Sequence, residues 1–177
     1  CYLLAAGADG LVLIDQHAAH ERIWFEKLLD HAQKGAPSQA LLLPETVELP
    51  LSQISLLMRH RQIFEQVGFD LEPLGSTTIM VNALPANLPS SHIAEIFSGM
   101  LHELLDNEQN KFPVALEYVA RAACKAAVKF HDKLTVEAAK ALMAQLQSCR
   151  QPTLCPHGRP TMITVTYAEI EKRFQRK

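Results

Sequence analysis

The sequence lacks the signatures that define several common classes of protein. Its 177 residues contain no GxxxxGK(S/T) or GxGxxG loop, so neither of these phosphate-binding motifs is available. No apolar run approaches the roughly 20 residues that a membrane-spanning helix requires, and the N-terminus has no basic region of the signal-peptide type. We therefore expect a cytoplasmic globular domain excised from a longer protein, with no membrane partner.

Positive charge is also scarce. The chain has 17 basic and 19 acidic residues, and a formal net charge of −2. A protein that binds DNA tightly on its own usually presents a basic face, because much of the affinity comes from neutralising phosphates. We interpret the only dense basic stretch, residues 172–177, as a solvated helix face. If DNA is the substrate, another domain or a partner has to deliver it.

Four cysteines are too few for a dense disulfide framework in a chain of this size. Because histidines lie near some of them, metal ligation is the better interpretation for two of the four. Cys1 and Cys149 have no motif around them, so we expect these two to be ordinary core or surface residues.

Apolar periodicity and turn residues indicate a mixture of helices and hairpins without a regular βαβ repeat. The predicted fold class is therefore α+β. Of all residues 48% are apolar and 20% are charged, as in an ordinary globular domain. Gly68 is expected to end a helix and Thr135 to begin one. Strands are predicted over 2–6, 11–14, 69–72, 77–83 and 162–167, and helices over 18–32, 51–67, 93–105, 114–130, 135–147 and 168–177.

Acidic and imidazole groups gather at the junction between an apolar strand and the helix that follows it. Asp15 ends the strand, where functional carboxylates are often found. His17 and Glu21 are four residues apart, so they share one face of the helix. His20 is adjacent to Glu21 in sequence and is expected to point elsewhere.

Glu26 lies five residues beyond Glu21 and is rotated away from it. Two interpretations remain open. Glu26 supports the site through Arg22, its neighbour one turn earlier, or the two residues form an ordinary surface ion pair.

A second group of candidate ligands lies in the loop of residues 155–160. Cys155 and His157 are two residues apart, so their side chains lie on one side of an extended segment. Pro156 stiffens this segment, Gly158 permits a turn, and Arg159 supplies a planar set of donors. Thiolate, imidazole and carboxylate together suit zinc, whereas manganese or magnesium prefers more oxygen ligands. The spacing alone leaves metal binding and a chance pairing equally open, and the HExxH, HxxEH and deaminase signatures are all absent.

Three motifs in order resemble a known family. Residues 15–26 match the pattern DQHA-x₂-E-x₄-E, residues 155–160 read CPHGRP, and residues 123–125 read ACK where the family has ACR. The chain is thereby similar to the C-terminal endonuclease domain of the MutL mismatch-repair family. Lys125 keeps the charge of the family's arginine but not its bidentate geometry.

The resemblance implies a homodimerising α+β domain that nicks one strand of duplex DNA and depends on divalent metal. It places a dimerisation and metal-site subdomain at residues 1–44 and 117–177, and an inserted α/β regulatory subdomain at 45–116. Mn²⁺ is the implied activating ion and Zn²⁺ the structural or regulatory one. The implied catalytic residues are Asp15 and Glu21. The implied metal ligands are His17, Glu21, Cys124, Cys155 and His157, with Glu26, Lys125 and Arg159 in support.

Further partners are implied by the same resemblance. Residues 39–44, QALLLP, are similar to the family's Q-x-(L/I)-x-x-P segment that docks on the sliding clamp, with Gln39, Leu41, Leu42 and Pro44 as contacts. Without the family context, a loop leading into a strand is the plainer interpretation. A mismatch-recognition protein and ATP would act only through other parts of the full-length chain. We expect a nucleoid-associated protein whose isolated domain binds DNA weakly.

Two rival functions remain. The first is a non-catalytic module for dimerisation and clamp docking, in which zinc joins the two ends of the chain. The second is a zinc hydrolase that acts on a small molecule, which the missing hydrolase signatures argue against. Manganese-dependent nicking of DNA would distinguish the endonuclease from both.

Overall fold

A computed structural model describes residues 2–35, 38–86, 88, 93–105, 116–122 and 134–175. Contacts divide the chain into two units, which are described separately. Unit 1 comprises Cys1–Glu26 and Phe130–Lys177, and unit 2 comprises Lys27–Lys129. Unit 1 is therefore built from both ends of the sequence.

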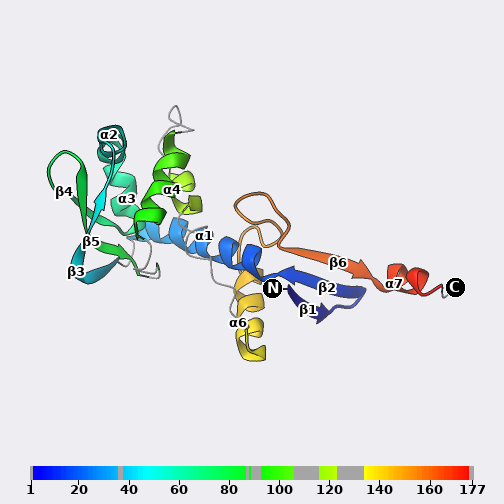
Figure 1. The fold of residues 1–177 in the computed structure, drawn as a ribbon. Coiled ribbons are helices and arrows are strands. Elements are labelled where there is room, and N and C mark those ends of the chain that lie inside the picture. Colours follow the sequence, from blue (N-terminus) through cyan, green and yellow to red (C-terminus); the bar gives the residue numbers. More distant parts are fainter. Residues whose placement is uncertain are drawn as a thin grey trace. The chain divides into compact units, whose positions relative to one another are not determined.

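The sheet of unit 1 joins the beginning of the chain to its end (Figure 1). Strands β1 (Tyr2–Ala6) and β2 (Gly10–Asp15) form the predicted antiparallel hairpin, and β6 (Met162–Thr166) pairs antiparallel with the other edge of β2. Gly10 allows this second pairing, because a Cβ atom at that position would lie 2.2 Å from the carbonyl oxygen of Val165. The close approach therefore lies at the C-terminal end of β6, opposite the first residue of β2.

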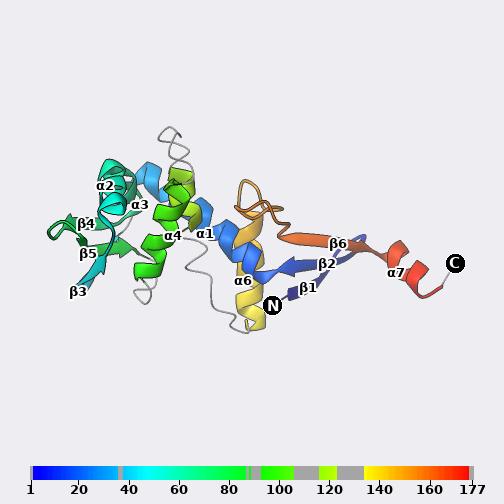
Figure 2. The same cartoon turned by 45° about the horizontal axis from the view of Figure 1, so that its top comes forward.

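Three helices belong wholly or partly to unit 1. Helix α1 (Gln16–Lys34) starts directly after β2, α6 (Val136–Gln147) lies beside the start of α1, and α7 (Tyr167–Arg173) follows β6 (Figures 1 and 2). As predicted, Thr135 caps α6: its Oγ1 accepts the N–H of Ala138 at 3.2 Å. The buried core between these elements consists of Ile14, Ala19, Ile23, Leu142 and Leu146.

The two faces of this sheet differ in what covers them. Val12 and Met162 pack against the core on one face. Side chains alternate along a strand, so Leu4 and Ile163 point away from that core, and they are 66% and 54% exposed. The outward face is therefore apolar and, within the part of unit 1 that the structure describes, open to solvent.

Unit 2 contains a second antiparallel sheet in the order β3-β5-β4, with β3 (Ser38–Glu48), β4 (Asp70–Pro73) and β5 (Thr78–Pro85). Its helices α2 (Leu51–Arg59), α3 (Arg61–Val67) and α4 (Ile93–Leu105) bury apolar stripes, and residues 116–122 are also helical. The rings of Phe64, Phe69 and Phe97 meet in its core, with centroids 5.1–6.0 Å apart.

One predicted helix of unit 2 is in fact two. The stretch 51–67 is interrupted at His60, whose φ of −103° and ψ of 14° separate α2 from α3. The prediction missed this break because both halves keep the same apolar periodicity. Gly68 does end α3 with a left-handed φ of 106°, as predicted.

Strand β3 bulges where clamp docking was predicted. Ala40 pairs with Ala83, but the next paired residue of β3 is Glu45, opposite Val81. Four residues, Leu41 to Pro44, thus face a single residue of β5 across the bulge. Leu42 and Leu43 are 103% and 81% exposed there. The segment lies within a strand, so the plainer prediction of a loop leading into a strand was wrong.

The predicted α+β class is confirmed, since helices accompany two small antiparallel sheets. Contacts divide the chain at residues 27 and 129, outside the predicted limits of 45 and 116. The difference arises because β3 starts at Ser38 and pairs with β5, whereas the predicted limits followed the motifs. The regulatory role of this unit stays a prediction. No described helix is long and apolar enough to cross a membrane.

Candidate metal centre

Asp15 occupies the predicted strand end and also begins α1. Its Oδ1 accepts the backbone N–H groups of His17 at 2.9 Å and of Ala18 at 3.1 Å, which is the bonding of an N-cap residue. Its own N–H donates to the carbonyl oxygen of Thr161 at 2.8 Å. Asp15 therefore links β2, α1 and the segment that leads into β6.

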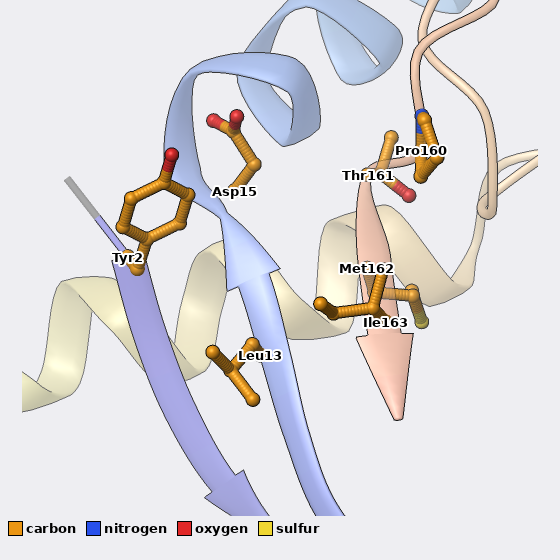
Figure 3. Close-up of a pocket in the computed structure, with 7 residues that line it drawn as sticks. All are labelled: Tyr2, Leu13, Asp15, Pro160, Thr161, Met162 and Ile163. Carbon is orange, nitrogen blue, oxygen red and sulfur yellow. The ribbon is translucent and has the colours of Figure 1, made fainter. Parts of the chain in front are cut away.

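A pocket of about 280 Å³ opens beside this junction (Figure 3). Tyr2 and Asp15 are direct partners across the β1–β2 pair, so the aromatic ring stands next to the carboxylate. In this pocket the polar carboxylate of Asp15 borders the apolar outward face of the sheet. Its lining consists of Tyr2, Leu13, Asp15, Pro160, Thr161, Met162 and Ile163.

Glu21 lies six residues further along the chain, in α1, and is fully buried. Its Oε1 lies 3.2 Å from Nε2 of His17, the predicted partner on the same helix face. Its Oε2 lies 3.4 Å from Nδ1 of His157 and 3.5 Å from Nη2 of Arg159. The carboxylate is thus surrounded by imidazole and guanidinium groups from both ends of the sequence.

Opposing effects act on the pKa of Glu21. Burial raises the pKa of this carboxyl, but the hydrogen bond with His157 and the charges of His157, His17 and Arg159 together outweigh burial. The pKa is therefore held below its usual range. The carboxyl is ionised at neutral pH, which is the form that binds a cation.

The loop after α6 delivers the remaining ligands. The N–H of Cys155 donates to the carbonyl oxygen of Arg159 at 2.8 Å, and the N–H of Gly158 donates back to Cys155 at 2.9 Å. Gly158 adopts a φ of 80°, which favours glycine. The loop closes tightly and keeps the Cys155 thiol buried and facing α1, with His157 partly buried beside it.

Glu21, Cys155 and His157 form a group suited to a metal ion. Their ligand atoms all lie within 4.8 Å of one another, whereas two ligands of one tetrahedral zinc lie about 3.3–3.8 Å apart. Small side-chain movements would close that difference. Nε2 of His157 is buried without a hydrogen-bond partner among the described residues, and Oε1 of Glu21 is buried with no hydrogen bond there beyond its 3.2 Å approach to Nε2 of His17. Such orphaned atoms are unusual, so the donor set fits zinc.

The other described residues considered for the site lie outside the group of Glu21, Cys155 and His157. Asp15 is not a member of the three-residue group. Cys124 and Lys125 lie outside the described residues. His20 bonds to its own helix through Nδ1, 2.8 Å from the carbonyl oxygen of Gln16. Arg159 is exposed along most of its length but reaches Glu21 at its tip.

Glu26 contacts the loop that precedes Cys155. Its carboxylate accepts the N–H groups of Arg150 at 2.6 Å and of Gln151 at 3.1 Å, and lies 3.6 Å from Nη1 of Arg22. Only 12% of the side chain is exposed. The geometry therefore differs from an ordinary surface ion pair, and the supporting role of Glu26 stays a prediction.

Sequence reasoning missed Thr161 as part of this centre and considered Arg22 only as the partner of Glu26. Thr161 is fully buried, and its hydroxyl donates a short hydrogen bond to the carbonyl oxygen of Pro152. Arg22 is buried and donates from Nε to the carbonyl oxygen of Leu154 at 2.5 Å. A single threonine carries no sequence signal, and nothing in the sequence places Arg22 beside Leu154, which lies 132 residues later.

A family model described as the MutL C terminal dimerisation domain matches residues 1–134. The chain belongs to this family. Proteins named DNA mismatch repair protein MutL from Symbiobacterium thermophilum and Geotalea daltonii are 41% and 38% identical to it over 99% of this chain. The chain spans 28% and 30% of the length of these two relatives. It therefore corresponds to less than a third of a MutL protein.

The two described cysteines make a matched pair for testing the metal centre. Cys155→Ser removes the only thiol of the three-residue group, so we expect it to lower the zinc bound per chain after dialysis to less than about a tenth. Cys149→Ser should leave zinc content unchanged, because the Cys149 thiol instead faces the carbonyl oxygen of Gln145 at 3.5 Å. Elemental analysis of the purified proteins measures both. Equal zinc content in the two variants would contradict the assignment.

Proposed function

We propose that this MutL domain is a metal-dependent endonuclease that nicks DNA during mismatch repair. The observation that carries the proposal is the buried Glu21 carboxylate, which meets the Cys155 thiol and the His157 imidazole six residues after Asp15. Carboxylate, thiolate and imidazole are zinc ligands. Family membership supplies the substrate class, because the relatives are named as DNA mismatch repair proteins.

Glu21, Cys155 and His157 would hold the ion, with His17 next to Glu21 and Cys124 as a further ligand proposed from the motif. When bound there, a divalent ion would supply Lewis-acid stabilisation of the charge that develops on the scissile phosphate. Zn²⁺ suits the sulfur ligand, and Mn²⁺ is proposed as the activating ion.

Asp15 would orient the attacking water and take its proton, while the bond from phosphorus to the leaving oxygen breaks. Both capping hydrogen bonds of Asp15 use Oδ1, so Oδ2 can serve this purpose without unwinding α1. The Arg159 guanidinium reaches Glu21 from a mostly exposed position, so it can also contact a phosphate. Lys125 is a second cation proposed from its motif.

The substitution Asp15→Asn tests the catalytic proposal directly. Asparagine caps helices about as well as aspartate, so the fold should persist while the acid–base group is lost. We expect nicking of supercoiled plasmid in Mn²⁺ to fall by roughly 10²–10⁴-fold, the usual contribution of a general base. The matched control is Asp9→Asn, which removes the same charge from the exposed hairpin turn of unit 1.

Full nicking by folded Asp15→Asn protein would contradict the role of Asp15. If the wild-type domain also leaves the plasmid intact, alone and with its clamp, the non-catalytic module becomes the better proposal. The net charge of −2 favours that alternative, because such a domain has little electrostatic affinity for DNA of its own. In either case the sliding clamp, the ATP-binding part of the full-length chain and a mismatch-recognition protein would deliver the domain.

Homodimerisation is proposed to use the outward face of the unit 1 sheet. Tyr2, Leu4 and Ile163 are exposed there, and a contiguous apolar face of this kind commonly marks a protein interface. The helix α7 that follows β6 buries none of its own residues, so it adds further surface for a second copy.

The substitution Leu4→Arg places a charge at the centre of this face. We expect it to convert the dimer to a monomer, because an unpaired charge at the core of an interface costs several kcal/mol. Leu74→Arg is the control, since Leu74 is a similarly exposed leucine (54%) in unit 2. Sedimentation velocity distinguishes the two states. A Leu4→Arg protein that still sediments as a dimer would exclude this face as the interface.

Docking on the sliding clamp is proposed for the bulged segment of β3. The motif comprises Gln39, Leu41, Leu42 and Pro44, and the bulge projects Leu42 fully into solvent. An exposed leucine next to a polar anchor can fill an apolar pocket on a partner.

Adjacent leucines of this segment allow a sharp comparison. We expect Leu42→Ala to weaken clamp binding by about 30-fold, the effect of losing an interface hot spot. Leu43→Ala should change binding less than threefold, because Leu43, unlike Leu42, is not among the contacts proposed from the resemblance. Both side chains are exposed, so neither change should alter the melting temperature. Calorimetric titration with the clamp measures the affinities, and equal losses for both would contradict the motif assignment.

A further inference from the structure

Residues 150–154 form a strap that joins α6 to the loop of Cys155 and His157. Each of its five residues has a backbone group bound from outside the strap. Irregular segments usually bond to water and move. This strap is instead fixed along its whole length, directly before the two candidate ligands.

Glu26 and Arg22 hold the two ends of the strap. The Glu26 carboxylate accepts the N–H groups of Arg150 and Gln151, at 2.6 and 3.1 Å. The Arg22 guanidinium donates to the carbonyl oxygen of Leu154, the residue before Cys155, at 2.5 Å. Arg22 also lies 3.6 Å from Glu26 and stands over the ring of Phe25, 5.4 Å from its centroid. The two residues therefore work as one unit on α1.

Thr161 holds the middle of the strap. Its hydroxyl donates to the carbonyl oxygen of Pro152, and its N–H donates to the carbonyl oxygen of Thr153 at 3.0 Å. Its own carbonyl oxygen accepts the N–H of Asp15 at 2.8 Å. Thr161 thus connects the strap to the strand end that carries the proposed catalytic carboxylate.

The buried polar residues of unit 1 are concentrated at this place. Among the described residues that are buried, Glu21, Arg22 and Thr161 are the polar or charged ones. Burying a guanidinium and a hydroxyl is costly unless their hydrogen bonds are satisfied. Here Glu21 belongs to the candidate metal group, whereas Arg22 and Thr161 donate side-chain hydrogen bonds to backbone carbonyl oxygens of the strap. An apolar core would have filled the same space at lower cost.

We propose that Arg22, Glu26 and Thr161 are positioning residues that hold Cys155 and His157 against Glu21 and so set the metal affinity of the centre. The inference rests on the proposed metal centre. Its physical basis is preorganisation: a ligand pair already fixed by outer hydrogen bonds loses less conformational entropy when a metal binds. None of the three residues contacts the ion in this scheme.

Thr161 offers the cleanest test, because valine and serine separate shape from hydrogen bonding. Thr161→Val keeps the shape and removes the hydroxyl donor, whereas Thr161→Ser keeps the donor. We expect Thr161→Val to weaken Zn²⁺ binding by roughly 10–100-fold, the usual effect of losing an outer-sphere hydrogen bond. Thr161→Ser should restore binding to within about threefold. Competition with a chromophoric chelator gives the affinities.

Glu26→Gln tests the end of the strap. Glutamine has one carbonyl acceptor for the two N–H groups of the strap, so we expect a similar loss of Zn²⁺ affinity. Substituted Co²⁺ gives an independent readout, because the intensity of its thiolate charge-transfer band reports how much thiolate, including that of Cys155, still binds the ion. That band should weaken in Thr161→Val and Glu26→Gln at metal concentrations that saturate the wild type.

Leu146→Val is the control for general destabilisation, since Leu146 is buried in the core of unit 1 and outside the strap contacts. It should lower the melting temperature of the metal-free protein and leave Zn²⁺ affinity unchanged. The positioning role is overturned if Leu146→Val weakens Zn²⁺ binding as much as Thr161→Val and Glu26→Gln do. It is also overturned if Thr161→Val and Glu26→Gln both bind Zn²⁺ within twofold of wild type. If the wild type shows no thiolate band and binds no Zn²⁺, the proposed metal centre itself fails.

Discussion

The burial of one carboxylate is the constraint on which the rest of the centre depends. Glu21 is fully buried, and a buried carboxylate costs several kcal/mol unless opposite charges or hydrogen bonds compensate for it. His17 stands one turn away, but His157 approaches from 136 residues later in the chain. The fold of unit 1 must therefore bring both ends of the sequence together, and the pairing of β2 with β6 does this.

The same sheet separates two functions by the alternation of its side chains. One face packs on α1 and α6 and supports the buried centre. The other face exposes Tyr2, Leu4 and Ile163 and is proposed to meet a second copy. Asp15 lies at the end of β2, paired with Tyr2 and next to the first turn of α1. A substrate phosphate at Asp15 would consequently lie near the proposed dimer surface, so dimer formation and access to the centre are expected to be coupled.

Much of the fold could be predicted from the sequence, because its signals are local. The hairpin around Gly10, the cap at Thr135 and the end of α3 at Gly68 each depend on a few neighbouring residues. The break at His60 was missed because both halves keep the same apolar periodicity, and the bulge in β3 depends on pairing with a distant strand, which local patterns do not encode. In the centre, the motifs correctly indicated that Glu21, Cys155 and His157 gather. The contacts of Arg22 and Thr161 with the strap could not be predicted, because they link residues whose separation in sequence says nothing of their distance in space.

X-ray absorption at the zinc edge of the purified wild-type protein tests the central claim most directly, since it reports the atoms bound to the ion. The account predicts a first shell with sulfur at about 2.3 Å and nitrogen or oxygen at about 2.0–2.1 Å. The sulfur contribution should fall in protein that lacks the Cys155 thiol, because Cys124 would remain as the other proposed thiolate ligand. A shell of oxygen and nitrogen alone in the wild type would show that Cys155 is not a ligand, and the centre described for Glu21, Cys155 and His157 would be contradicted.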